Sequence, residues 1–314
     1  MTRAIFPEVL ASLSQRFEVE HNADDRPWPP EDVARRAREA DAIMSTVMDR
    51  IDATVMSAAA SLKVVSNIAV GYNNVDVAEA TRRGIRVTNT PGVLDDTTAD
   101  LAWALLMAAA RRIAEGDAHV RAGDWKVAFS VQGFLGADVH HATLGIIGMG
   151  RIGQAIARRA RGFDMRLTYH NRKRLDAAEE ARLGVQWVER DQLLAQSDFV
   201  VVMVPYSPAT HHLIGAAEIA KMKPTAILVN AARGGVVDDA ALAQALKENR
   251  IAGAGLDVFE AEPQVHPGYL GIRNVVLTPH VGSASRATRL AMCQKAADNL
   301  TAVLEGREPA NPVN

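Results

Sequence analysis

The sequence has little of what marks secreted, membrane or nucleic-acid-binding proteins. Its single cysteine, Cys293, excludes an intramolecular disulfide and a metal site built from several thiolates. It has no apolar run long enough to cross a bilayer and no signal peptide, so we expect a cytoplasmic protein without a membrane partner. A formal net charge of only −2 gives no reason to expect nucleic acid as a partner.

The rest of the composition is typical of a globular α/β protein with two domains. A chain of 314 residues is large for one hydrophobic core, and its 48% hydrophobic and 23% charged residues are ordinary values. Short apolar runs alternate with helical patterns, which favours parallel sheets covered by helices. The expected strands form two series, the first over Phe17–Glu20, Ala42–Met44, Lys63–Ala69 and Ile85–Asn89, the second from Leu144 on and over Arg166–Tyr169, Phe199–Val204, Ala226–Asn230, Gly253–Asp257 and Val275–Thr278.

Two helical patterns bear on how the domains are connected. Residues 100–112 lie between the two series of strands and are apolar nearly all round, which predicts a buried helix. The last helical pattern, about 287–305, follows the second series and could return to the first domain.

A glycine-rich segment follows the apolar run that starts the second series. Gly148, Gly150 and Gly153 form a GxGxxG pattern, and a helical pattern begins directly after it. In a dinucleotide-binding unit these glycines permit a tight turn, close approach of backbone to a pyrophosphate, and close packing of helix on strand. The phosphates then lie at a helix N-terminus, which favours negative charge. We therefore expect nucleotide binding here, with a purely structural turn as the alternative.

The residues after the next apolar run indicate which dinucleotide is bound. A protein that prefers NAD places an acidic residue there for the ribose 2′-hydroxyl. This chain has Asn171, Arg172, Lys173 and Arg174 instead. No carboxylate repels a 2′-phosphate, and Arg172 and Arg174 are available to pair with one, so NADP is favoured over NAD. A solvated basic helix start is the alternative.

Three candidate catalytic residues follow strands of the second series. Arg233 has the rigid fork that matches a carboxylate, Glu262 precedes a proline in an extended loop, and His280 lies just past the last expected strand. A histidine held by a carboxylate has its imidazolium stabilised and becomes a competent proton donor. Each residue alone has an ordinary explanation, as a surface cation, a loop carboxylate and a strand-end histidine. Their common place at strand ends behind one nucleotide motif favours a catalytic site.

Four segments, in this order and spacing, resemble the D-isomer-specific 2-hydroxyacid dehydrogenases: GMGRIG at 148–153, NAARGG at 230–235, LDVFEAEP at 256–263 and PHVGSA at 279–284. The resemblance covers essentially the whole chain. It implies an α/β protein of two doubly wound domains, with a Rossmann cofactor domain at 100–285 inserted in a smaller flavodoxin-like substrate domain at 1–99 and 286–314.

The resemblance also implies residue roles. His280 is the acid/base, Glu262 its carboxylate partner, and Arg233 the anchor for substrate carboxylate and keto oxygen. Backbone N–H groups of Val70 and Gly71 hold the substrate carboxylate. No metal is expected. The implied cofactor contacts are Thr98, Gly148, Gly150, Arg151, Ile152, Gly153, Asn171, Arg172, Arg174, Val204, Pro205, Ala231, Asp257 and Gly282. Thr98 and Asp257 could equally be a helix cap and a strand-end cap.

Within the family, segments 68–76, 136–141 and 311–314 are most similar to bacterial glyoxylate/hydroxypyruvate reductases, which also reduce 2-ketogluconate. This similarity implies a cytosolic homodimer that uses NADP(H) in preference to NAD(H) and reduces small 2-keto acids to D-2-hydroxy acids. Which 2-keto acid is physiological stays open. The alternatives are an NAD-dependent family member acting on another acid, and a nucleotide-sensing corepressor of the same fold, which the absence of an interaction tail disfavours.

Two further expectations concern the chain's surfaces and its start. Trp125, Phe129 and Phe134 are candidate dimer contacts in the region 116–135, with packing inside the domain as the alternative. Relatives usually open with a complete strand before the segment resembling Thr2–Pro7, whereas this chain begins within it. We expect either a first sheet that lacks most of one strand or a translation start upstream of Met1.

Overall fold

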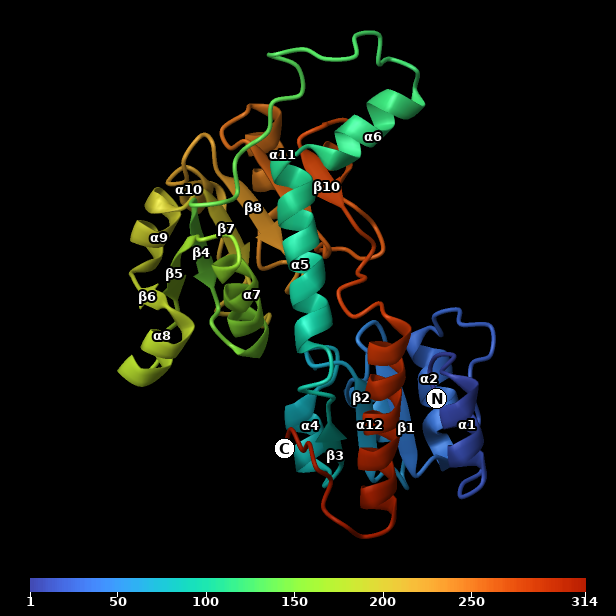
Figure 1. The fold of residues 1–314 in the computed structure, drawn as a ribbon. Helices are drawn as coiled ribbons and strands as arrows, with labels where there is room; N and C mark the ends of the chain where they lie inside the picture. Colours follow the sequence, from blue (N-terminus) through green and yellow to red (C-terminus); the bar gives the residue numbers. More distant parts are fainter. The chain divides into compact units, whose positions relative to one another are not determined.

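The computed structural model describes residues 1–314, and its contacts divide the chain into two compact units (Figure 1). Unit 1 consists of Met1–Leu94 and Ser283–Asn314, and unit 2 consists of Asp95–Gly282. The divisions fall a few residues before those expected at 99/100 and 285/286. The first division lies earlier because helix α5 (Asp95–Ala110) packs against helix α7 (Arg151–Arg161) and strands β8 (Ile227–Asn230) and β9 (Gly253–Leu256) of unit 2.

Unit 1 is built on a three-stranded parallel sheet with the order β1-β2-β3. Successive side chains of β1 and β2 point to opposite faces, so each face has its own apolar cluster. Helices α1 and α12 cover one face, and α2, α3 and α4 cover the other, which makes the unit doubly wound. The bounds are β1 Ala42–Thr46, β2 Val64–Ile68, β3 Arg86–Thr88, α1 Pro7–Ser14, α2 Pro30–Arg36, η1 Ala37–Glu39, α3 Ala53–Ala58, α4 Val77–Arg82 and α12 Arg286–Leu304.

The last helix does return to unit 1, as its pattern suggested. Ser285 caps α12 by accepting a hydrogen bond from the Thr288 N–H, and the Ser66 hydroxyl of β2 donates to the Ala296 carbonyl at 2.8 Å. The strand expected over Phe17–Glu20 is wrong. The free edge of β1 is instead contacted by Thr2, whose N–H donates to the Met44 carbonyl at 3.1 Å, and residues 17–20 lie outside the sheet.

Unit 2 is built on a seven-stranded sheet in which every pairing is parallel, with the order β10-β9-β8-β7-β4-β5-β6. The strand order reverses between β4 and β7, the switch point where such sheets bind ligands at their carboxyl ends. The strands are β4 Thr143–Ile147, β5 Arg166–His170, β6 Val185–Trp187, β7 Phe199–Val202, β8 Ile227–Asn230, β9 Gly253–Leu256 and β10 Val275–Leu277.

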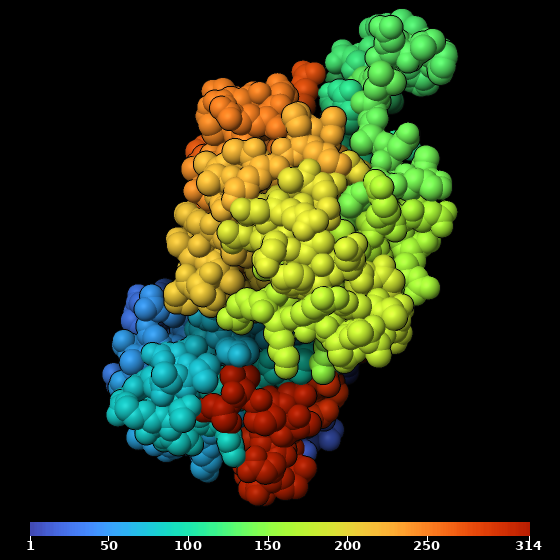
Figure 2. All heavy atoms as spheres, turned by 90° about the vertical axis from the view of Figure 1, so that its left-hand side faces the viewer, coloured from blue at the N-terminus to red at the C-terminus, as the bar shows by residue number.

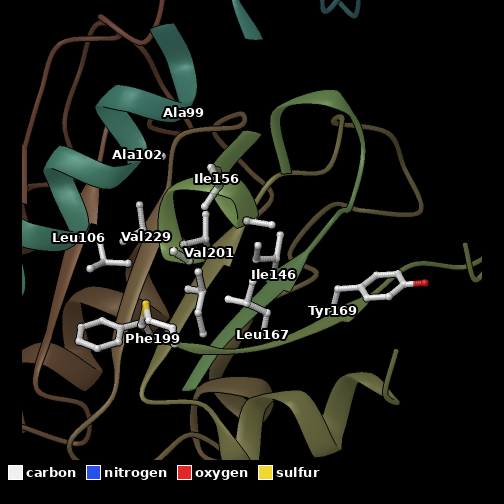
Figure 3. Packing of buried hydrophobic residues seen from close by; sticks show 14 of the residues in the cluster. Ala99, Ala102, Leu106, Ile146, Ile156, Leu167, Tyr169, Phe199, Val201 and Val229 are labelled. Atoms are coloured by element: carbon white, nitrogen blue, oxygen red, sulfur yellow. The ribbon is translucent and has the colours of Figure 1, made fainter. Parts of the chain in front are cut away.

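Helices cover both faces of this sheet, and each face has its own buried cluster. On one face, Ala102 and Leu106 of α5 and Ile156 of α7 pack over strand residues such as Val201 and Val229 (Figure 3). The apolar pattern of α5 is thus explained by its burial between α7 and the sheet. The other helices are α6 Ile113–Arg121, α7 Arg151–Arg161, α8 Ala177–Leu183, α9 Arg190–Gln196, α10 Ala216–Ile219, α11 Asp239–Lys247 and η2 Pro267–Tyr269.

One part of unit 2 contributes no buried residue to either cluster. Helix α6 has no buried side chain, and the segment after it extends away from the rest of the unit (green in Figures 1 and 2). We call residues 113–135 the arm. None of the helices in the structure is long and apolar enough to span a membrane.

Candidate active site

The glycine-rich turn joins the end of β4 to the start of α7 and leaves room above it. Gly148 has a φ of +104°, and a Cβ there or at Gly153 would overlap a backbone carbonyl. Gly150 occupies the N-cap position of α7 without a side chain to bond the first N–H groups, and a Cβ at this position would meet nothing within 4 Å. Arg151 and Ile152 then start the helix, whose first turn holds no acidic residue. Open space beside an uncapped helix N-terminus fits the pyrophosphate of a dinucleotide.

The segment after β5 differs from the expected arrangement in one respect. Asn171 accepts a hydrogen bond from the Met149 N–H at 2.7 Å, which ties the strand end to the glycine turn. Arg172 is exposed and forms no ion pair within the chain. Arg174, however, is not available as expected, because it donates two hydrogen bonds, at 2.8 and 2.7 Å, to Glu180.

The reason is the burial of Glu180, which lies 2.8 Å from the buried Tyr169 hydroxyl. A buried carboxylate needs a counter-charge and hydrogen bonds. The Arg174 guanidinium and the Tyr169 hydroxyl together hold the pKa of Glu180 below its ordinary value. Arg174 therefore compensates a carboxylate of its own unit, and Arg172 is the free guanidinium at this strand end.

The expected histidine–carboxylate pair is present. His280 Nδ1 lies 2.7 Å from Glu262 Oε2, and Glu262 Oε1 accepts a hydrogen bond from the Phe259 N–H at 2.9 Å. His280 has a φ of +53°, and its N–H donates to the Asp257 carbonyl at 2.9 Å. Because Nδ1 is engaged, the other ring nitrogen, Nε2, is left without a partner and can act on a ligand.

The charge of Glu262 is stabilised within this pair. Burial raises the pKa of the Glu262 carboxyl, but hydrogen bonds from His280 and Phe259 and the charges of His280 and Arg233 outweigh burial. The pKa of Glu262 therefore lies below its ordinary value, and the residue is ionised at neutral pH.

Arg233 is a buried cation with unused hydrogen-bonding capacity. It follows β8, its Nη1 donates to the Ala232 carbonyl at 2.9 Å, and its buried Nε has no hydrogen-bond partner. Burial lowers the pKa of this guanidinium, and the charge of Glu262 acts in the opposite direction. A guanidinium stays protonated even so. A buried guanidinium with an unpaired N–H is suited to bind an anionic ligand such as a carboxylate.

Asp257 stabilises the loop that follows β10 through hydrogen bonds. Its Oδ1 accepts hydrogen bonds from the Thr278 hydroxyl at 2.6 Å and the Val281 N–H at 2.8 Å, and its Oδ2 accepts one from the Gly282 N–H at 2.8 Å. Burial raises the pKa of Asp257 although these bonds oppose it. A Cβ at Gly282 would touch both Asp257 and Thr98, so these three expected cofactor contacts lie together.

The remaining expected residues of unit 2 lie at the same edge of its sheet. Val204 and Pro205 follow β7, and a Cβ at Gly148 would come within 2.9 Å of Val204 Cγ1. Ala231 is buried directly after β8. Unit 2 thus collects its expected residues at the carboxyl ends of β4, β5, β7, β8, β9 and β10.

Val70 and Gly71 belong to unit 1, where they follow β2. The Asn89 amide donates to the Val70 carbonyl at 2.8 Å, and the Asn67 amide donates to the Gly71 carbonyl at 2.9 Å. The N–H groups of Val70 and Gly71 have no partner within the chain. Sequence reasoning missed the two asparagines. The signal that could have found them is an asparagine at the end of an apolar strand, where a buried amide must bond to backbone.

Comparisons with known proteins agree with this geometry. Residues 103–282 match the family model of the D-isomer specific 2-hydroxyacid dehydrogenase, NAD binding domain. The chain is 51% identical over 316 residues to a glyoxylate reductase of Korarchaeum cryptofilum, and the match covers 100% of this chain and 95% of that protein. It is 50% identical over 317 residues to a glyoxylate reductase of Thermococcus gammatolerans, with the same coverage.

A solved structure is similar along nearly the whole chain. It is an NADPH-dependent glyoxylate/hydroxypyruvate reductase from Sinorhizobium meliloti in complex with NADP and malonate. The identity is 37%, the TM-score is 0.88, and the match covers 99% of this chain and 94% of that chain. A full-length match at these identities, together with a nucleotide turn and a histidine–carboxylate pair at one sheet edge, shows that the chain belongs to the D-isomer specific 2-hydroxyacid dehydrogenase family of oxidoreductases.

Proposed function

We propose that this protein reduces small 2-keto acids, glyoxylate, hydroxypyruvate and 2-ketogluconate among them, to D-2-hydroxy acids with NADPH. The observation that carries the proposal is the His280–Glu262 pair in the same unit as Arg233, a buried guanidinium whose Nε lacks a partner. These groups supply a proton and an anion-binding site, which are what the protein itself contributes when a bound cofactor reduces a keto acid. The names of the similar proteins support this substrate class.

The site fits a nicotinamide dinucleotide. The N-terminus of α7 and the open space above Gly150 would hold its pyrophosphate, and Arg172 would pair with a 2′-phosphate. When bound, the reduced cofactor supplies a hydride to the keto carbon. The preference for NADPH over NADH rests on Arg172 alone, because Arg174 is paired with Glu180.

The residues of the chain carry the rest of the reaction. Arg233 binds the substrate carboxylate and stabilises the negative charge that grows on the keto oxygen. Protonated His280 donates the proton on Nε2 to that oxygen while Glu262 holds Nδ1 and fixes the ring orientation. In unit 1, the N–H groups of Val70 and Gly71, which have no partner within the chain, would suit a carboxylate. Oxidation of the hydroxy acid needs His280 in its neutral form.

The proposal is tested by mixing the purified protein with NADPH or NADH and a panel of glyoxylate, hydroxypyruvate, phenylpyruvate and 2-ketogluconate. We expect loss of the reduced-nicotinamide absorbance with the small 2-keto acids, faster with NADPH, and a D-configured product from hydroxypyruvate. Turnover with none of these acids would refute the substrate assignment. Equal or better turnover with NADH would refute the cofactor preference.

We also propose that the protein is a homodimer joined through the arm. Most apolar side chains of the arm are exposed, among them Trp125 at 59% and Phe129 at 81%. The alternative, packing inside the domain, therefore does not account for Trp125 and Phe129. It does apply to Phe134, whose ring lies against Arg112 and His119. Several large apolar side chains exposed in one segment favour an interaction site there.

A further inference from the structure

The loop that carries Glu262 is fastened to the start of α11 by a reciprocal pair of hydrogen bonds. The Glu260 N–H donates to Asp239 Oδ2 at 3.0 Å, and the Asp239 N–H donates to Glu260 Oε1 at 2.9 Å. Each side chain thus binds the backbone of the other residue. Two antiparallel bonds between the same two residues restrict both the position and the rotation of the loop. We call this arrangement the Asp239–Glu260 clasp.

The clasp is buried on its Asp239 side. The Tyr269 hydroxyl donates to Asp239 Oδ1 at 3.0 Å, and both residues are buried. All the partners of the Asp239 carboxylate are donors, so it acts as an acceptor at both oxygens. Glu260 also contacts His212 Nε2 at 3.0 Å, and His212 lies 3.6 Å from Asp238. These groups and His266 are the charged or titratable neighbours of the clasp.

The loop transmits the position of the clasp to the catalytic pair. Only Ala261 separates Glu260 from Glu262, whose two carboxylate oxygens bind the Phe259 N–H and His280 Nδ1. On its other side the loop touches the segment after Arg233, because a Cβ at Gly234 would overlap the Phe259 carbonyl. A shift of this loop would therefore move Glu262 relative to both His280 and Arg233.

We propose that Asp239 is a positioning residue: through the Asp239–Glu260 clasp it sets the loop from Phe259 to Glu262 so that the Glu262 carboxylate meets His280. Asp239 itself touches neither His280 nor Arg233. Its effect on turnover rests on the proposed function, but its effect on the His280–Glu262 hydrogen bond does not.

The test compares three variants of the full chain. Asp239→Ala removes the acceptor for the Glu260 N–H, and we expect kcat for glyoxylate reduction to fall about 10- to 100-fold, as for a small misplacement of a catalytic group. Its pH–rate profile should differ from that of the wild type, because the contact between Glu262 and His280 is disturbed. Asp239→Asn can place its amide oxygen on the Glu260 N–H and should restore most of the rate and the profile.

Asp238→Ala is the matched control. Asp238 caps α11 by accepting the Ala241 N–H at 2.9 Å, so its loss destabilises the same helix start without opening the clasp. We expect this variant to keep the pH profile of the wild type. The proposal is overturned if Asp239→Ala keeps the kcat and profile of the wild type, if Asp238→Ala reproduces its loss, or if Asp239→Asn fails to restore activity.

A measurement independent of turnover tests the positioning role even if the protein reduces no 2-keto acid. Proton NMR of the protein without substrate should show a downfield Nδ1–H resonance of His280, assigned by its loss in Glu262→Gln. We expect Asp239→Ala to shift or lose this resonance and Asp238→Ala to keep it. If Asp239→Ala does not fold, Asp239→Leu combined with Tyr269→Phe keeps the shape and leaves no unpaired hydroxyl. An unchanged resonance would overturn the positioning role even if the wild type reduced no 2-keto acid.

Discussion

At the scale of single residues, the site combines charges that are paired with charges that are not. Glu262 is satisfied by His280 and Phe259, and Arg174 by Glu180, whereas Arg233 keeps a buried N–H without a partner and Arg172 is exposed. The unpaired cations are the ones expected to meet a carboxylate and a phosphate. The paired charges fix the geometry of the site.

Glu262→Gln should lower stability in a pH-dependent way. The folded pKa of Glu262 lies below its ordinary value of 4.5, so its contribution is fully present above that pH and is lost as the pH falls through the lower folded value. We expect the variant to be about 1–3 kcal/mol less stable than the wild type at neutral pH, from a lost charged hydrogen bond. Urea unfolding of both proteins should show the difference shrinking on acidification below the ordinary glutamate range. A difference that is constant with pH would contradict the ion pair.

Arg172→Gln should change cofactor selectivity. The loss of a charged partner for the 2′-phosphate should raise the KM for NADPH about 10- to 100-fold, the scale of one hydrogen bond to a charged group. The KM for NADH should stay the same. Arg174→Gln is the control, because Arg174 is bonded to Glu180 and its loss should lower the melting temperature rather than the selectivity. Equal effects of the two variants on the NADPH/NADH ratio would contradict the assignment.

At the scale of elements, the sequence predicts the strands and helices that have a clear apolar pattern and misses those that lack one. Strands β1–β5 and β7–β10 are predicted by apolar runs, and the β4-turn-α7 unit lies where GxGxxG places it. Strand β6 (Val185–Trp187) is missed because its three residues, with Gln186 in the middle, form no apolar run. Residues 17–20 alternate like a strand, but Thr2 contacts the free edge of β1 in their place.

The site residues follow the same rule. Arg233, Glu262 and His280 could be predicted because each follows an apolar run, and parallel strands bring their carboxyl ends to one edge. The pairing of Arg174 with Glu180 could not, because it depends on the burial of Glu180 and of Tyr169, which no local pattern reveals. The Asp239–Glu260 clasp joins the start of α11 to the loop after β9, and no local pattern in the sequence reveals this contact either.

Two glycines of the turn should respond differently to alanine. A Cβ at Gly153 would overlap the Gly148 carbonyl, so Gly153→Ala must push α7 away from β4 and should cost about 1–3 kcal/mol of stability, as overpacking does. Gly150→Ala meets only open space and should keep the melting temperature, but its methyl group occupies the place expected for the pyrophosphate. Calorimetric titration with NADPH should show weakened binding in Gly150→Ala. Unimpaired binding there would move the cofactor elsewhere.

At the scale of the whole molecule, each unit has a sheet with apolar clusters on both faces, and the arm belongs to neither core. The α/β class and the doubly wound architecture were predictable because strand and helix patterns alternate throughout. The expected unit boundaries differ from the observed ones by a few residues, because the whole of α5, from its first residue, belongs to unit 2.

The arm should decide the oligomeric state. Phe129→Asp places a charge in the exposed apolar surface and should weaken self-association about 10-fold or more, as the loss of an interface anchor does. Leu270→Asp is the control, because Leu270 is 71% exposed on the same unit but lies outside the arm. Light scattering coupled to size-exclusion chromatography should show dimers for the wild type and the control, and monomers for Phe129→Asp at low concentration. A monomeric wild type would contradict the proposal.

The insertion of unit 2 within the sequence of unit 1 orders the events of synthesis. Unit 2 is continuous, so all its strands are synthesised before the last helix. The sheet of unit 1 must wait, because one face is covered by α12, and the bond from Ser66 to Ala296 joins residues 230 positions apart. We therefore expect nascent unit 1 to stay exposed until the chain is nearly finished and to be the half that depends on chaperones. Released chains that end before Arg286 should resist proteolysis only over unit 2.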